Sequence, residues 1–271
     1  MKRGEAPDAV ASDYRHKFHA GNHADVWKHV AMGAVLAHRA ARGPIVESHA
    51  GEGLYRLLPT GEWTEGVGPA LKAWPQGSGS AAVDRWLVAV RAAGNGRYPG
   101  SPWLARRWAP DDRYVGHELR EDTAAHLRAE VPGAEVVVGD GWAGLRAAAV
   151  SRGSVVLVDP PYVAREDWTA ATDALGFVHT RGAIGVLWYP AKSWARPNLL
   201  HQRLRTAKVP FVAIDLVVTP LDLDRRALAG SGVVLVGAPE ASVVELHAAA
   251  AVLGPTLATH GQWFVRTTAA N

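Results

Sequence analysis

The chain has 271 residues, of which 48% are hydrophobic and 20% charged, with a formal net charge of +3. This is the composition of a globular protein with a sizeable core, and the length suits one large α/β domain or one domain carrying an insertion. The absence of cysteine excludes disulfides, thiolate nucleophiles and thiolate metal sites. No apolar run reaches the roughly 18 residues of a membrane span, and the N-terminal MKRGEAPDAVASDYRH lacks the apolar core of a signal peptide, so we expect a cytoplasmic protein without membrane contact.

Short apolar runs rich in β-branched residues alternate with helical segments along the chain. We expect strands at 44–48, 113–118, 135–139, 154–158, 183–188, 211–218 and 232–237. Continuous apolar runs favour strands buried on both faces, and intervening helices favour parallel crossovers. The expected fold class is therefore α/β, with a doubly wound, Rossmann-like sheet. We expect the chain ends, residues 1–12 and the final TTAAN, to be frayed.

The separation between the first two expected strands is too long for a simple crossover, which needs only one helix. It contains turn-rich pieces such as PTGEWTEGVGP and WPQGSGS, and an amphipathic helical stretch at 81–93. We interpret residues 54–99 as a small inserted helical subdomain. Residues 1–53 and 100–271 would then form the main domain.

Ligands of open parallel sheets bind beyond the carboxyl ends of the strands. The first strand is followed by SHAGEG at 48–53, whose glycines let backbone N–H groups approach a ligand and open a helix, a weak indication of a nucleotide. Glu118 ends the second strand, where its carboxylate suits two ribose hydroxyls or, equally, a helix start. Asp140 and Gly141 follow the third strand, where they suit an adenine amino group and its ring, or simply a turn.

The fourth strand ends in the sequence Asp-Pro-Pro-Tyr, residues 159–162, which matches a motif of amino-group methyltransferases. An adenine amino nitrogen is a poor nucleophile because its lone pair is delocalised, so two acceptors aimed at its hydrogens favour attack. The Asp159 carboxylate supplies one acceptor and the Pro160 carbonyl, fixed by the consecutive prolines, the other. Tyr162 can stack on the base. Proton loss to Asp159 or water is then easy, and the chemistry requires no metal.

A longer signature accompanies this motif. The segment YRHKFHAGNHADVWKH at 14–29, with YPGSP, DPPY and LWYP, resembles the bacterial 23S rRNA adenine-N6 methyltransferases of the RlmJ family. The resemblance runs from Tyr14 nearly to the end of the chain. It implies a Rossmann-like class I methyltransferase with an inserted helical subdomain. Such an enzyme uses S-adenosylmethionine to methylate N6 of one adenine of 23S rRNA, position 2030 in the usual assignment. We take a monomer as the default.

The resemblance also assigns residues. It makes Asp159 the catalytic acid of the Asp-Pro-Pro-Tyr motif and Tyr14 a contact to substrate RNA. The residues that it places in the donor pocket are His29, His49, Ser101, Glu118, Asp140 and Gly141, and we add Lys28 as a partner for the donor's carboxylate. The chain departs from the family pattern at Glu47, where an aspartate is usual, and at Glu52, which interrupts the glycines.

Other functions fit parts of the sequence. The histidines His16, His19, His23 and His29, with Asp25, suit a metal-dependent hydrolase, although the AGN before His23 indicates a turn and we expect no metal. The altered glycine turn suits a non-catalytic RNA-binding relative, against which the intact Asp-Pro-Pro-Tyr argues. DNA adenines and protein amides also present a planar amine, and only the family signature favours rRNA.

Overall fold

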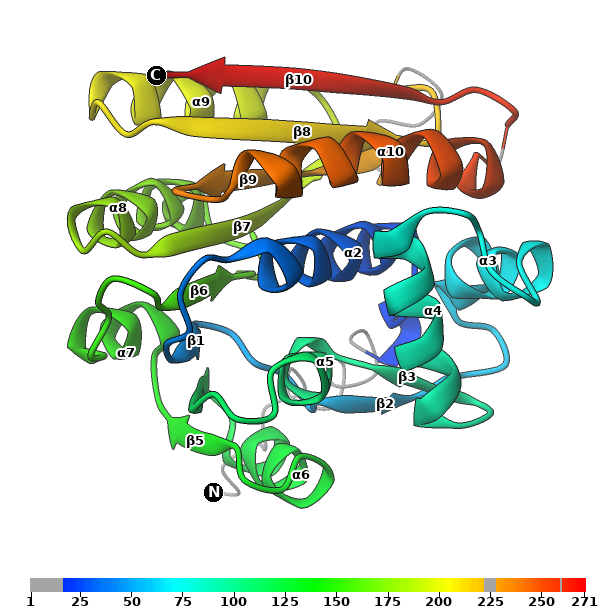
Figure 1. Ribbon diagram of the computed structural model, residues 1–271, viewed down its shortest axis with the longest axis horizontal. Coiled ribbons are helices and arrows are strands. Elements are labelled where there is room, and N and C mark those ends of the chain that lie inside the picture. The colour runs from blue at the N-terminus through cyan, green and yellow to red at the C-terminus, as the bar shows by residue number, and fades with distance from the viewer. Residues whose placement is uncertain (1–16, 222–227, 259) are drawn as a thin grey trace, which may run out of the picture.

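Eight strands form one sheet in the order β10-β8-β9-β7-β6-β1-β4-β5 (Figure 1). The computed structural model describes residues 17–221, 228–258 and 260–271. The strands of this sheet are β1 (Ile45–Glu47), β4 (Tyr114–Glu118), β5 (Glu135–Val138), β6 (Val155–Val158), β7 (Ile184–Ala191), β8 (Phe211–Val217), β9 (Gly230–Val236) and β10 (Phe264–Ala270). Each of the seven strands expected from the sequence is present.

The sheet is mixed, which corrects the expectation of parallel crossovers throughout. Strands β5, β4, β1, β6 and β7 pair in parallel, whereas β9 lies antiparallel between β7 and β8, and β10 pairs antiparallel with β8. The chain returns after β8 to lie directly beside it as the antiparallel β9, so no crossover is made. The expectation of a frayed C-terminus is wrong, because Thr267, Thr268 and Ala269 pair with β8.

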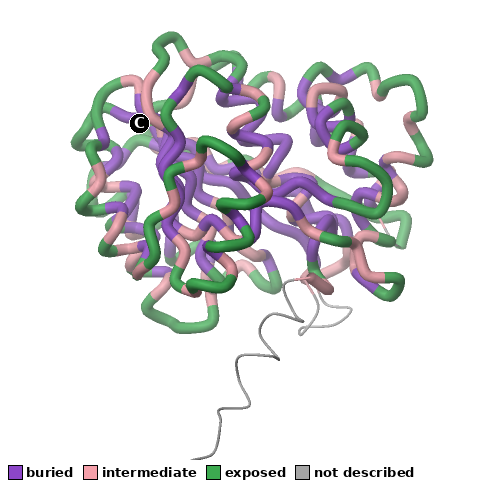
Figure 2. Tube along the Cα trace, turned by 90° about the horizontal axis from the view of Figure 1, so that it is seen from below, coloured by how far each residue is buried: buried purple, intermediate pink, exposed green. Residues whose placement is uncertain are grey.

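Helices cover both faces of the sheet, and two buried clusters separate them from it. The helices on one face, which is toward the viewer in Figure 1, are α2 (His23–His38), α4 (Ala81–Ala93), α5 (Ser101–Trp108) and α10 (Glu240–Leu257). Those on the other face are α7 (Gly141–Ala147), α8 (Glu166–Thr180) and α9 (Ala195–Thr206), while α6 (Glu121–Glu130) lies beside β4 and β5. Figure 2 shows the strands as a buried layer between more exposed helices and loops. In the described part of the chain, no helix is long and apolar enough to cross a membrane.

The segment 54–99 contains a two-stranded sheet as well as helices. Its elements are β2 (Leu54–Arg56), the 3-10 helix η1 (Glu62–Glu65), α3 (Val67–Ala73), α4 and β3 (Arg97–Pro99). Strands β2 and β3 pair antiparallel, and just outside them the Gly100 N–H donates to the Gly53 carbonyl at 2.8 Å. The glycine turn therefore leads into β2, and the expectation that it opens a helix is wrong: the next helix of the main sheet, α5, begins only at Ser101. Because the two ends of the segment meet, we propose to keep the division of the chain at 54–99.

Candidate active site

The corner after β6 is held rigidly by covalent geometry and by contacts to β7. Tyr162 has a left-handed φ of 52°, which is uncommon for a residue with a side chain. Its hydroxyl donates to the Trp188 carbonyl at 2.8 Å, and its ring lies 4.4 Å from that of Trp168, centre to centre. Pro160 is buried and fixes its own φ, so the backbone that follows Asp159 has little freedom. The corner presents Asp159 at the carboxyl end of β6 in one orientation.

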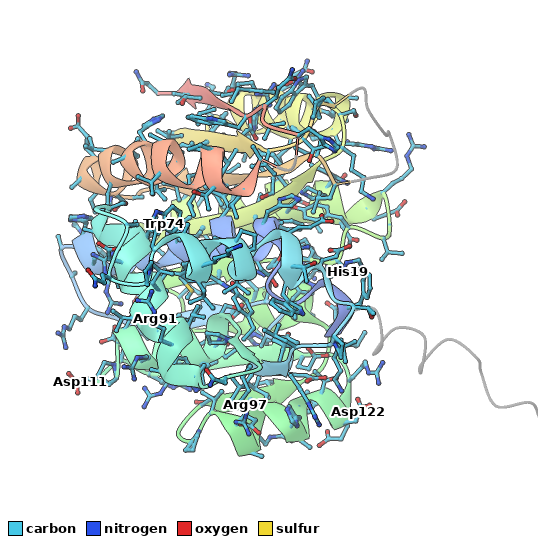
Figure 3. All side chains as sticks on the ribbon, turned by 90° about the vertical axis from the view of Figure 1, so that its right-hand side faces the viewer. His19, Trp74, Arg91, Arg97, Asp111 and Asp122 are labelled. Atoms are coloured by element: carbon cyan, nitrogen blue, oxygen red, sulfur yellow. The ribbon has the colours of Figure 1, made fainter. Side chains whose placement is uncertain are left out.

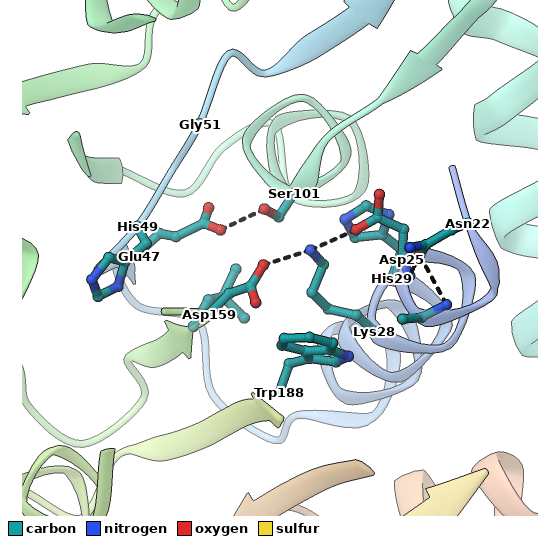
Figure 4. Close-up of polar contacts among 12 residues, drawn as sticks. Asn22, Asp25, Lys28, His29, Glu47, His49, Gly51, Ser101, Asp159 and Trp188 are labelled. Atoms are coloured by element: carbon teal, nitrogen blue, oxygen red, sulfur yellow. Dashed lines mark hydrogen bonds and ion pairs between the residues drawn. The ribbon is translucent and has the colours of Figure 1, made fainter. Parts of the chain in front are cut away.

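Lys28 of α2 joins the Asp159 carboxylate to a second acid. Its Nζ lies 2.5 Å from Asp159 Oδ2 and 2.8 Å from Asp25 Oδ1, with the Trp188 ring beside it (Figure 4). Burial by itself would lower the pKa of Lys28, but the two carboxylates outweigh it and raise that pKa well above its ordinary value. The ammonium is thus charged at all physiological pH values. It faces Asp159, and its contact with the donor's carboxylate stays a prediction.

Helix α2 can carry this lysine because its start is well capped. The Asn22 side chain accepts hydrogen bonds from the N–H groups of Ala24 and Asp25, an arrangement worth about 1 kcal/mol. Asp25 and Lys28 are three residues apart and so share one face of the helix. Asp25 Oδ2 also accepts from the Gly21 N–H at 2.9 Å. This hydrogen bond holds the Asp25 carboxylate in place, and the carboxylate in turn orients Lys28.

Glu47, at the end of β1, is fully buried between two hydroxyl groups. Ser101 Oγ donates to its Oε1, and the Tyr114 hydroxyl donates to its Oε2 at 2.6 Å. Burial is the largest influence on this acid and raises its pKa to about 8, although both hydrogen bonds act in the opposite direction. Ser101, assigned to the donor pocket, is therefore positioned by a glutamic acid that holds its proton near neutral pH.

This burial makes the stability of the chain depend on pH. Folded Glu47 keeps its proton up to pH about 8, whereas an unfolded glutamate loses it near 4.5, so the free energy of unfolding falls as the pH rises through that window. We expect Glu47→Gln, which imitates the protonated acid, to match the wild-type melting temperature at pH 5 and to exceed it at pH 8.5. Thermal denaturation across this range tests the expectation, and parallel pH profiles for the two proteins would contradict it.

The ends of β1, β4 and β5 meet around the glycine turn. The Gly51 N–H donates to Glu118 Oε2 at 3.1 Å, and Oε1 of the same acid accepts from the Arg120 N–H. Gly141 is packed so closely that an added Cβ would lie 1.8 Å from the Ser48 carbonyl oxygen. The His49 ring lies 4.8 Å from that of Trp142, centre to centre. The structure thus brings the predicted donor residues at the ends of three strands close to one another.

Asp140 and His29 have structural partners of their own. Asp140 Oδ1 accepts from the Ala143 N–H at 2.7 Å and caps α7. His29 is buried, and its Nδ1 is 2.8 Å from the Tyr98 hydroxyl. Burial, assisted by the charge of Lys28, lowers the pKa of His29 to about 3, so the imidazole is neutral. Within the described residues its buried Nε2 has no hydrogen-bond partner.

The histidines proposed as rival metal ligands point to different partners. His19 Nδ1 pairs with Glu62 at 2.7 Å, His23 Nε2 lies 3.1 Å from the Leu228 carbonyl, and His29 contacts Tyr98. His16 lies outside the described residues, as does Tyr14, so the role of Tyr14 stays a prediction.

Several residues of the site were not given a site role from the sequence. The sequence suggested Asp25 only as a metal ligand, Glu47 only as a departure from a pattern, and Trp188 only as part of the LWYP signature. The three-residue spacing of Asp25 and Lys28 was a usable signal, as was an acid at the end of a buried strand. Tyr98 and Tyr114 carried no such signal, because their partners come from distant segments.

Comparison with known proteins identifies the family. Residues 44–268 match the family described as ribosomal RNA large subunit methyltransferase D, RlmJ. The chain belongs to this family. The ribosomal RNA large subunit methyltransferase J of Escherichia coli (strain K12) is 32% identical over 247 residues, covering 83% of this chain and 87% of the relative. That of Haemophilus influenzae is 28% identical over 270 residues, covering 92% and 95%. The RlmJ resemblance drawn from the signature is confirmed.

A solved structure confirms the fold. A protein from Legionella pneumophila superposes with a TM-score of 0.82 at 24% identity, over 93% of this chain and 98% of that one. The expected α/β, Rossmann-like fold is therefore correct for this RlmJ family member.

Proposed function

We propose that this chain transfers a methyl group from S-adenosylmethionine to the exocyclic N6 of an adenine in 23S ribosomal RNA, position 2030 by family resemblance. Family membership supports the substrate class, since the curated relatives carry the name of a ribosomal RNA large subunit methyltransferase. The observation that carries the reaction type is the rigid corner at Asp159, whose Oδ2 is held by Lys28.

The corner is suited to a planar amine. With Oδ2 engaged by Lys28, Oδ1 of Asp159 is the oxygen we assign to one amino hydrogen, and the Pro160 carbonyl to the other. Both acceptors favour the tetrahedral nitrogen that attack requires, and they cost no reorganisation because the prolines and Lys28 fix them beforehand. The N–C bond would form as the methyl–sulfur bond breaks and its electron pair stays on sulfur, and the proton that the nitrogen releases passes to Asp159 or to water. Tyr162 can stack against the adenine once it has left its own helix.

The donor pocket fits the residues present. Gly141 packs against the Ser48 carbonyl with no room for a side chain, and His29 brings a buried nitrogen without a partner in the described chain. The residues we propose to hold the donor are Lys28, His29, His49, Ser101, Glu118, Asp140 and Gly141. Glu118 already accepts two backbone N–H groups, but each carboxylate oxygen has a second lone pair for a ribose hydroxyl. When bound, S-adenosylmethionine supplies an electrophilic methyl group on a positive sulfonium.

The deciding experiment incubates the purified chain with tritiated S-adenosylmethionine and unmodified 23S rRNA fragments, followed by mass spectrometry of the labelled nucleoside. We expect N6-methyladenosine at one site, with the same yield in a parallel reaction containing EDTA. Label only on DNA or protein amides would redirect the proposal to those amines, and donor binding without transfer to any of them would indicate a non-catalytic binder. We further propose that the chain acts as a monomer in the cytoplasm, and light scattering of the purified protein tests the oligomeric state.

A further inference from the structure

Trp194 is stacked on an arginine at the surface. The Arg266 guanidinium carbon lies 3.5 Å from the centre of the Trp194 ring, and the Phe264 ring lies 6.0 Å from it, centre to centre. Trp194 itself is half-buried, and Phe264 is 42% exposed. Arg266 and Phe264 are two residues apart on β10 and so present their side chains on the same face of the strand.

The arginine below the ring is fixed in place. Its Nε donates to Asp215 Oδ2 at 2.7 Å, and its Nη1 donates to Asn198 Oδ1 at 2.8 Å. Asp215 is fully buried and also accepts from the Tyr189 hydroxyl. A buried acid thus orients the guanidinium, and the guanidinium supports one face of the Trp194 ring. This is a preformed aromatic platform, because neither group needs to reorganise to bind a flat partner.

Trp194, the centre of this platform, comes shortly after β7 in the chain, and β7 is the strand that carries Trp188 beside the reaction centre. Leu187 of β7 pairs with Val158 of β6, so Trp188 lies beside Asp159. Trp194 follows six residues later, which at about 3.3 Å per residue places it within roughly 20 Å of Trp188. That span corresponds to a few nucleotides of an RNA strand.

The surroundings are cationic. Lys192 is exposed and Arg196 is half-buried. The pKa of His19 is raised first by its hydrogen bond to Glu62, and the charge of Lys192 acts against this rise, so the two side chains are within electrostatic range of each other. His19 is labelled in Figure 3. Lys192 thus lies between the platform and the segment that carries His19, where Glu62 is the acidic partner.

We propose that one surface of the protein binds and stacks an unpaired nucleotide of the RNA strand that carries the target adenine. This surface, called the Trp194 surface, consists of Lys192, Trp194, Arg196, Phe264 and Arg266. The inference rests on the proposed function. An adenine withdrawn from its helix leaves its neighbours without stacking partners, and an aromatic ring replaces that stacking whatever the base. Lys192 and Arg196 match the phosphates on either side of the stacked base.

The test measures binding, so it does not depend on methyl transfer. Fluorescence anisotropy with a fluorescein-labelled single-stranded RNA taken from 23S rRNA gives the Kd of each variant. We expect Trp194→Ala to weaken binding roughly 5- to 100-fold, and Trp194→Phe to retain affinity within about threefold, because phenylalanine still stacks. The matched control is Phe177→Ala, since Arg181 also covers Phe177 but near the far end of α8. Its affinity should equal that of the wild type.

A second pair of variants tests the charge. Lys192→Gln should lower the slope of log Kd against log salt by about 0.7, the value for one phosphate contact on a single strand. Lys208→Gln should leave the slope unchanged, because this exposed lysine precedes the start of β8, whereas Phe264 pairs with Val217 at the other end of that strand. Wild-type affinity in Trp194→Ala, equal losses in Trp194→Ala and Phe177→Ala, or no RNA binding by the wild type would overturn the proposal. If RNA binding depends on Trp194 but no methyl transfer is detected, the proposed function is contradicted and the proposal for the Trp194 surface is retained.

Discussion

Replacing Asp159 by alanine is expected to lower kcat for methyl transfer about a thousand-fold, because it removes the acceptor aimed at the reacting amine. The fold should survive, since Lys28 keeps Asp25 as a partner at 2.8 Å and is not left as an isolated charge. Donor affinity should change by less than about threefold, because the lost contact acts on the amine and the fold is retained. Single-turnover kinetics with labelled donor and calorimetry with S-adenosylhomocysteine separate these two quantities.

The matched control for this change is Asp173→Ala, which removes an exposed carboxylate from α8 of the same chain. Its kcat should equal that of the wild type. Wild-type turnover in Asp159→Ala would refute the catalytic assignment. Equal losses of turnover and donor affinity would make Asp159 a residue of the donor pocket instead.

Replacing Gly141 by alanine is expected to damage the donor pocket and the fold together. The new Cβ would lie 1.8 Å from the Ser48 carbonyl oxygen and 2.8 Å from its carbon, and backbone atoms cannot rotate away as a side chain can. The ends of β1 and β5 must then separate, at a cost of about 3 kcal/mol or more. For a chain of this size the melting temperature should fall by roughly 6 °C or more, and calorimetry should show a loss of S-adenosylhomocysteine affinity of at least about tenfold.

Gly176→Ala provides the comparison. Gly176 lies within α8, and an added Cβ there meets nothing within 4 Å. Alanine is the better helix former, so the free energy of unfolding of this variant should exceed that of the wild type by roughly 0.5–1 kcal/mol. A melting temperature for Gly141→Ala that is no lower than that of Gly176→Ala would contradict the packing described for the strand ends.

The strands that the sequence predicted are those with the strongest local signal. Runs such as 154–158 are apolar at nearly every position because both faces are buried, and this property can be read without knowing the partner strand. Strand β10 was missed because its exposed edge carries Arg266, Thr267 and Thr268, which dilute the apolar pattern. The three-residue strands β2 and β3 are too short to stand out from their turns. The direction of β9 depends on how its connection runs, which composition does not record.

The candidate site likewise contains residues that the sequence predicted and contacts that it did not. Asp159, Glu118, Asp140 and Gly141 were predictable because each lies at or just beyond the end of a recognisable strand, and parallel strands bring their carboxyl ends to one edge. The placement of Lys28 against Asp159 depends on how α2 packs across the sheet. The protonation of Glu47 likewise depends on burial by segments far away in sequence. Such properties belong to the packed molecule and leave little trace in any short stretch.

The contact between Gly53 and Gly100 also bears on how the chain folds. Pairing β1 with β4 joins residues separated by the whole 54–99 segment. Closing so long a loop is slow, because the chain loses conformational entropy before the contacts of the sheet form and stabilise it. The chain between β2 and β3 runs through η1, α3 and α4, and once the two strands have paired, the two ends of the segment are neighbours. The path from β1 to β4 then passes only through the glycine turn and α5. Once it has formed, the segment therefore shortens the effective chain separation between β1 and β4, which lowers the effective contact order of the central sheet.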